Sequence, residues 1–132
     1  PEERLEALED WVGRLRRDCE AKPVLVEGRR DRAALARLGC EGGVIVFNDG
    51  ASLIDTADRI SREHAAIILL LDWDRTGGSI HRRMKEALEA LGVRCDERYR
   101  KELAVLVSKE TKSLEGVPGY LSRLRALVGG RG

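Results

Sequence analysis

Three acidic side chains follow apolar segments of the sequence and could together hold a metal ion. Asp72 and Asp74 stand in a D-x-D spacing directly after the apolar run 65–71, and Glu27 follows the short apolar run 23–26. Carboxylate oxygens suit Mg²⁺, which keeps several waters and takes few carboxylates together with substrate phosphates. Close carboxylates also repel one another unless a cation offsets their charge. The alternative is that the three acids are separate caps or ion pairs on loops.

The segments that must position these acids alternate between strands and helices. Apolar runs bounded by Pro or Gly predict strands over 22–28, 42–50 and 65–72, and the last is expected to be buried on both faces because it never alternates. Helical spacing of apolar residues predicts helices over 2–19, over 31–39, from Ser52 onward and over 76–91. This alternation is typical of an α/β fold, here a Rossmann-like parallel sheet of three to four strands with helices on both faces.

The order of the strands decides whether the acids meet. Ligands gather beyond the carboxyl ends of parallel strands, and Glu27 and Asp72 are placed at two such ends. An order of second, first and third strand, with right-handed crossovers, makes these two strands neighbours. We therefore expect the three acids at one edge of the sheet.

The remaining elements lie towards the C-terminus. The segment 92–95 predicts a short fourth strand, 97–110 a helix, and the residues after a break at 117–119 a closing helix. The side chains expected to face inward from the helices that follow the second strand are Leu53, Ile54, Ala57, Ile60, Ile80, Met84, Ala87, Leu88, Leu91, Leu103, Leu106, Val107, Tyr120, Leu121, Leu124 and Leu127.

Composition limits the class of protein. The 132 residues suffice for one domain over 1–132, and 42% hydrophobic with 36% charged residues indicates a globular chain. No apolar run approaches membrane-spanning length, and the odd, widely spaced Cys19, Cys40 and Cys95 are expected to be reduced, so we expect a cytoplasmic protein. The absence of Gln and the single Asn, Asn48, suggest adaptation to heat.

Basic residues cluster just past the two acidic strand ends, although the net charge is only +1. Arginine beside a bound metal is suited to bidentate contact with phosphate. The alternative is a solvated helix face, since Ile80 and Met84 are expected to point inward and leave Arg82 in water. The candidates for binding phosphate or nucleic acid are Arg29, Arg30, Arg32, Arg75, Arg82 and Arg83.

Three further side chains have chemistry of their own. His64 and His81 have no Cys or His partner at ligand spacing, so both are expected to be structural or solvated. Trp73, between the two aspartates, is expected to pack under the loop or to touch a base.

The segments VEGRRD (26–31) and LLDWDRTG (70–77) resemble the two motifs of the Toprim domain, over roughly residues 22 to 95. The short chain is most similar to small stand-alone Toprim proteins of archaeal type. The resemblance implies that Asp72, Asp74 and Glu27 hold Mg²⁺, for which Mn²⁺ could substitute, and that Glu27 acts as general acid or base. It also implies that Gly28 and Gly77 let the backbone turn tightly beside them. Many relatives have another acid where this sequence has Thr76, which puts a second metal site in doubt.

The resemblance implies a protein that acts on nucleic-acid phosphodiesters of RNA or DNA, as a nuclease or by nucleotidyl-type transfer. The alternative from a different class is a non-catalytic, metal-assisted adaptor that binds nucleic acid in a larger complex, with its N-terminal helix docking a protein partner.

A phosphatase is a third interpretation. D-W-D-R-T also fits the D-x-D-x-T signature of haloacid-dehalogenase-type phosphatases, in which the first Asp is the nucleophile. That fold has the motif on its first strand and needs a later Lys and acidic pair, whereas here the motif follows the third expected strand. A two-component receiver domain would need paired acids after its first strand, where this chain offers only Glu27.

Overall fold

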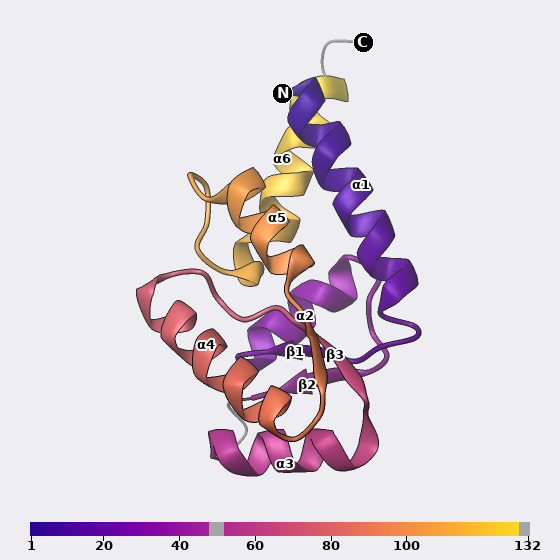
Figure 1. Cartoon of the computed structure of the whole chain (residues 1–132). Helices are drawn as coiled ribbons and strands as arrows, with labels where there is room; N and C mark the ends of the chain where they lie inside the picture. The colour runs from indigo at the N-terminus through magenta and orange to yellow at the C-terminus, as the bar shows by residue number, and fades with distance from the viewer. Residues whose placement is uncertain (48–51, 130–132) are drawn as a thin grey trace.

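The computed structural model describes residues 1–47 and 52–129, which form six α-helices, one 3-10 helix and four strands (Figure 1). In chain order these are α1 (Glu2–Asp18), β1 (Val24–Val26), α2 (Arg29–Arg37), β2 (Val44–Val46), α3 (Leu53–Glu63), β3 (Ala66–Leu69), α4 (Arg75–Ala90), β4 (Arg94–Asp96), α5 (Arg98–Val107), η1 (Leu114–Gly116) and α6 (Val117–Gly129). Residues 48–50 of the strand expected over 42–50 lie outside the described residues.

The four strands form one parallel sheet in the order β2-β1-β3-β4. The predicted second, first and third order is therefore correct, and the fourth strand pairs with β3. In the register of the central pair, Val24 lies opposite Ile68 and Leu25 opposite Leu69. The carboxyl ends of β1 and β3 consequently lie side by side, which brings the residues that follow them to one edge of the sheet.

Helices cover both faces of the sheet and bury two separate cores (Figure 1). On one face, Val24, Val26 and Ile68 pack with side chains from α1, α2, α5 and α6. On the other face, Leu25, Ile67 and Leu69 pack with side chains from α3 and α4. Alternate residues of the central strands thus enter opposite cores, as the period of two in a strand requires. The predicted α/β class with helices on both faces is confirmed.

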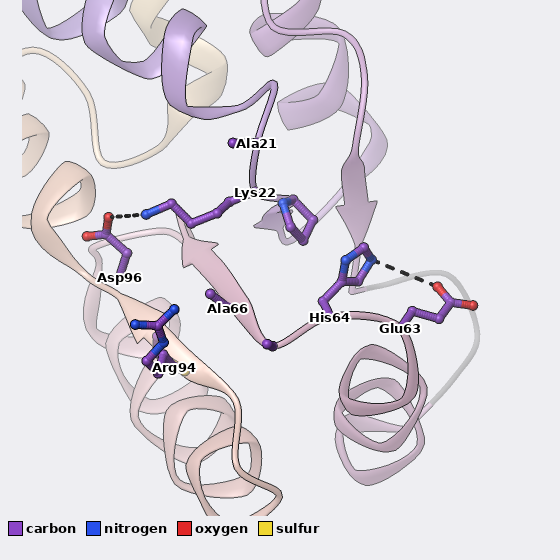
Figure 2. A pocket seen from close by; sticks show the side chains of 10 residues that line it. Ala21, Lys22, Glu63, His64, Ala66, Arg94 and Asp96 are labelled. Carbon is purple, nitrogen blue, oxygen red and sulfur yellow. Dashed lines mark hydrogen bonds and ion pairs between the residues drawn. The ribbon is translucent and has the colours of Figure 1, made fainter.

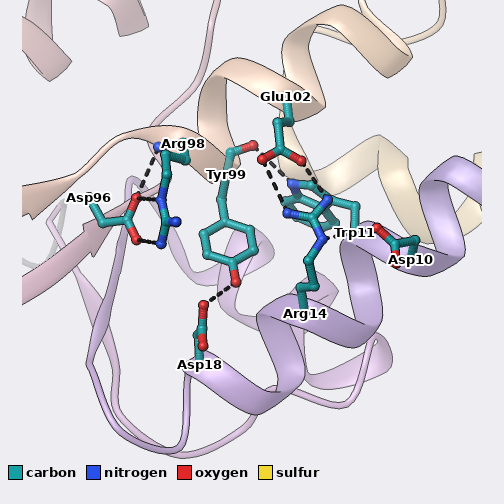
Figure 3. A network of polar contacts seen from close by, with 8 residues as sticks. All are labelled: Asp10, Trp11, Arg14, Asp18, Asp96, Arg98, Tyr99 and Glu102. Atoms are coloured by element: carbon teal, nitrogen blue, oxygen red, sulfur yellow. Dashed lines mark hydrogen bonds and ion pairs between the residues drawn. The ribbon is translucent and has the colours of Figure 1, made fainter.

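A network of polar contacts fastens α1 to α5 (Figure 3). The Trp11 indole Nε1–H donates to the Tyr99 carbonyl at 3.0 Å, and the Tyr99 hydroxyl donates to the Asp18 carboxylate. Arg14 Nη1 donates to Glu102 at 3.1 Å and lies over the Tyr99 ring. Because Trp11 is fully buried, its indole needs this partner, so α5 is held at a fixed position over the sheet.

Several expected details differ in the structure. Ile54, Leu91 and Leu127 are 67%, 49% and 55% exposed rather than inward-facing. Leu91 lies at the C-cap of α4. On α3, the buried face carries Thr56, whereas Ile54 faces solvent. The C-terminal break comes earlier than 117–119, because α6 already begins at Val117 and carries Pro118 in its first turn, where no intrahelical donor is needed.

Within the described residues, no helix is both long enough and apolar enough to cross a membrane.

Candidate functional site

The carboxyl groups of Glu27 and Asp72 come together at the carboxyl edge of the sheet. Glu27 directly follows β1, and Asp72 lies three residues beyond β3, the neighbour of β1. The two side chains lie within hydrogen-bonding reach of each other. Glu27 Oε1 and Asp72 Oδ1 are buried and have no partner among the described residues. Ionised carboxylates only accept hydrogen bonds, so the pair requires a proton or a cation between them.

The electrostatics of this carboxyl pair favour a proton near neutral pH. Burial is the largest cause that raises the pKa of Asp72, followed by contact with Glu27 and the charges of Asp74 and Glu115, to about 7. Asp31, another buried acid nearby, has its pKa raised chiefly by burial as well. A divalent cation bound between Glu27 and Asp72 would displace the proton and offset the repulsion.

Asp74 has a different role from the other two acids. It is the N-cap of α4, and its Oδ1 accepts a hydrogen bond from the Gly77 amide at 2.6 Å. The cap uses one of its oxygens, while its charge still acts on Asp72. No group of three or more His, Cys, Asp or Glu side chains within residues 1–47 and 52–129 is arranged to hold a metal ion. The structure thus joins Glu27 and Asp72 and places Asp74 beside them as a helix cap.

The two glycines of the site differ in what they contribute. A Cβ on Gly77 would lie 2.3 Å from the Asp72 carbonyl oxygen, so only glycine allows α4 to begin this close to the end of β3. Gly28 has extended backbone (φ −137°) and open space for a Cβ, with Asp31 Oδ2 at 4.0 Å. Its amide donates to Asp31 Oδ2 at 3.1 Å, which starts α2 at Arg29, two residues earlier than expected. Gly28 therefore forms no tight turn that needs glycine.

Arg100 is a site residue that the sequence did not indicate. Its Nε donates to the Leu71 carbonyl at 3.0 Å and its Nη2 donates to the Asp72 carbonyl at 2.8 Å. Arg100 comes from α5, which lies beyond β4 in the chain, so no local motif links it to the D-x-D segment. The only available signal was its place on a helix expected over 97–110.

The residues around Arg100 form a second polar group. His81 is 7% exposed, and its Nε2 lies 2.7 Å from Glu97 Oε1, while Lys85 contacts Glu97 Oε2 at 2.9 Å. Burial lowers the pKa of His81, against the opposing effect of its contact with Glu97. Of the two roles expected for His81, the structural one is therefore correct, with Glu97 as partner.

Trp73 packs under a loop, which is one of the two roles expected for it. Its indole Nε1–H donates to the Thr111 carbonyl at 3.0 Å, and its amide donates to the Lys112 carbonyl at 3.2 Å. The ring contacts the core on the α1 side of the sheet. These bonds tie the D-x-D segment to the loop between α5 and η1.

The basic candidates all lie on the surface. Arg29, Arg30, Arg32, Arg75, Arg82 and Arg83 are exposed. Arg30 reaches Glu115 at 3.4 Å, a weak exposed pair. Arg75 and Thr76 open α4 directly after Asp74, so both are next to the carboxyl pair in the chain and on its solvent side.

A cavity of about 490 Å³ lies at the opposite edge of the sheet, at the amino ends of β1, β3 and β4 (Figure 2). Lys22 pairs there with Asp96 at 3.4 Å, and His64 lies 3.9 Å from Glu63. None of the predicted site residues lines this cavity. It is therefore separate from the carboxyl pair.

The fold and the site define an α/β protein with a four-stranded parallel sheet and a half-buried carboxyl pair at its carboxyl edge. By sequence the chain belongs to the UPF0292 family. It is 30% identical to the UPF0292 protein of Methanosarcina acetivorans over 127 residues, which cover 96% of this chain and 88% of the relative. It is 33% identical to the UPF0292 protein of Pyrococcus furiosus over 124 residues, covering 93% and 90%.

A solved structure of a protein from Aquifex aeolicus has the same fold. It matches with a TM-score of 0.69 and 29% sequence identity, over 80% of this chain and 94% of that chain. No family model matches the sequence.

Proposed function

We propose that this chain is a Mg²⁺-dependent, Toprim-type protein that acts on nucleic-acid phosphodiesters. The observation that carries the proposal is the contact between Glu27 and Asp72, whose buried oxygens have no partner among the described residues. A buried like-charge pair is destabilising unless something compensates it, and such pairs concentrate at functional sites. Its place beyond the carboxyl ends of adjacent parallel strands is where α/β proteins bind ligands.

The donor set fits Mg²⁺ better than a softer metal. The pair offers oxygen ligands only, and Mg²⁺ characteristically takes one or two carboxylates, several waters and substrate phosphates. Asp72 and Glu27 would hold the ion, and Asp74 would add negative charge beside it while capping α4. When bound, Mg²⁺ would neutralise the developing charge on a phosphoryl oxygen.

The chain's own residues would supply orientation and proton transfer. Glu27 would act as general acid or base through its carboxyl group, one oxygen of which is buried beside Asp72. Arg75, Arg82 and Arg83 extend an exposed basic face from the start of α4, suited to backbone phosphates on either side of the reacting one. This arrangement does not distinguish RNA from DNA.

The adaptor alternative uses the same carboxyl pair for binding alone. Thr76 stands at the start of α4 where a further acid could help to hold a second ion. Its hydroxyl favours the adaptor over a two-metal nuclease, since one weakly held ion supports docking more readily than in-line displacement.

The proposal is tested with structured RNA and DNA hairpins in Mg²⁺, in Mn²⁺ and in chelator. We compare wild type with Asp72→Asn and Glu27→Gln, and use Asp58→Asn as control because the Asp58 carboxylate pairs with exposed Arg62 on α3. Chelator-sensitive cleavage lost in both site variants supports the enzyme. Mg²⁺-dependent binding without products, again lost in both variants, supports the adaptor. Site variants that behave as wild type in every metal condition overturn the proposal.

A further inference from the structure

Two hydrogen bonds hold the guanidinium of Arg100 at the carboxyl edge of the sheet, and its other N–H groups have no partner among the described residues. Two of its five N–H groups are bound, by the carbonyls of Leu71 and Asp72 at 3.0 and 2.8 Å. The described part of the chain offers no hydrogen-bond partner to the other three. Because backbone carbonyls at the end of a central strand hold the group, its plane is fixed relative to the Asp72 carboxyl.

No carboxylate within the described residues contacts this guanidinium directly. Glu97 exerts the largest favourable charge on it, yet its two carboxylate oxygens are taken by His81 at 2.7 Å and Lys85 at 2.9 Å. Asp72 contacts Arg100 only through its backbone. A half-buried arginine is normally paired with an anion. No pairing anion therefore comes from residues 1–47 and 52–129.

The surroundings of Arg100 suit an anion that arrives with a cation. Its Nη2 would lie 3.9 Å from a Cβ on Gly78, so the guanidinium stands beside the first turn of the 16-residue helix α4, whose dipole attracts negative charge. The charges of Glu27, Asp72 and Asp74 also act on Arg100, and these acids repel anions. Neutralising the carboxyl pair would leave Arg100 as the dominant charge facing the ligand.

We propose that Arg100 binds a non-bridging oxygen of the nucleic-acid phosphodiester, through the N–H groups that have no partner among the described residues. This inference rests on the proposed function and adds to it a phosphate-binding residue from α5. A planar, always charged fork is the side chain best suited to a phosphate, and a lysine cannot reproduce its paired donors.

The test measures hairpin binding in Mg²⁺, because a cation at the carboxyl pair removes the repulsion between the acids and the phosphate. Arg100→Lys is compared with Arg98→Lys, its neighbour on α5, whose guanidinium binds Asp96 on the surface at 2.9 and 3.1 Å. We expect Arg100→Lys to bind an RNA or DNA hairpin roughly tenfold more weakly, with little change in salt slope because lysine keeps the charge and loses the paired donors. Arg98→Lys should bind as wild type. A purely structural role for Arg100 would lower the melting temperature and leave affinity unchanged, which would overturn the inference.

A second measurement uses the wild-type chain, in case the variant does not fold. The Nε–Hε resonances of the arginines are followed by NMR as the hairpin is added in Mg²⁺. The Arg100 signal should shift at saturating hairpin and the Arg98 signal should not. An unmoved Arg100 signal on a bound hairpin, or no hairpin binding at all, rules out the phosphate contact. The carboxyl-pair proposal fails separately, through Asp72→Asn behaving as wild type in Mg²⁺.

Discussion

The α-carbon of Gly77 and the carbonyl oxygen of Asp72 are so close that a Cβ on Gly77 would lie 2.3 Å from that oxygen. The same carbonyl accepts a hydrogen bond from Arg100 at 2.8 Å on another side. The backbone of Asp72 is thus held between the first turn of α4 and a side chain of α5. This double contact fixes where the Asp72 carboxyl meets Glu27.

Gly77→Ala should therefore be strongly destabilising. The added methyl cannot be accommodated without moving the end of β3, and we expect a loss of about 3 kcal/mol in the free energy of unfolding. Gly78→Ala is the matched control, because its Cβ would make only ordinary contact with Arg100 at 3.9 Å. Gly78→Ala should gain about 0.5–1 kcal/mol from helix propensity. Urea denaturation of both variants checks this, and equal stabilities would show that the backbone contact can relax.

Asp72→Asn should stabilise the fold while removing the site. The amide of Asn can donate to Glu27 where the carboxylate only repels it, so we expect a gain of about 1–2 kcal/mol at pH 8 without metal. Added Mg²⁺ should raise the melting temperature of wild type and leave that of the variant unchanged. Calorimetry with and without Mg²⁺ measures both effects. A variant less stable than wild type at pH 8 would mean that the carboxylate is already compensated.

The raised pKa of Asp72 also predicts a pH dependence of stability. The folded state binds this proton up to about pH 7, whereas an unfolded Asp releases it near pH 4. Between these values the folded state holds more protons, so stability should fall as pH rises from 4 to 7, by on the order of 2 kcal/mol after solvent screening. The difference between wild type and Asp72→Asn isolates this contribution. Denaturation at pH 5 and pH 8 measures it, and a difference that does not grow with pH would contradict the assignment.

Thr76→Glu distinguishes the metal site from the phosphatase interpretation. Thr76 is exposed in the first turn of α4, so the substitution should be tolerated, and an added carboxylate should raise Mn²⁺ affinity roughly tenfold. In a phosphatase the hydroxyl would contact the transferring phosphoryl group, and turnover of phosphate monoesters would be lost instead. Metal titration is run alongside nuclease and phosphate-ester assays. Monoester hydrolysis by wild type that disappears in Thr76→Glu would support the phosphatase.

Reversing two charges of the basic face should weaken nucleic-acid binding. Arg75 and Arg82 are exposed on α4, and changing both to Glu should lower hairpin affinity at least roughly tenfold at moderate salt and flatten its salt dependence. The control is the double variant Arg17→Glu with Arg37→Glu, because both residues are exposed and lie in the last turns of α1 and α2. Equal losses in both double variants across a salt series would indicate nonspecific attraction.

The sequence determined most of the fold because its signals are local. Unbroken apolar runs, such as that before Asp72, identify strands, and the Ser52 side chain caps α3 as its position indicated, accepting from the Asp55 amide at 3.1 Å. Alternation of strands and helices then restricts the sheet to few topologies. Details at helix ends were less predictable, since Leu91 and Ile54 fit the helical period and yet face solvent, where the sheet no longer covers the helix.

The acids of the site were visible in the sequence because strand ends and D-x-D spacing are local features. Only the tertiary structure decided how they divide their roles: Asp74 turns back to cap α4, while Asp72 faces Glu27 from the neighbouring strand. It alone also brought Arg100 to the Asp72 carbonyl, across 28 positions of sequence. The packing of α5 against α1 and the sheet sets that contact, and no spacing rule within one segment encodes a pairing between distant elements.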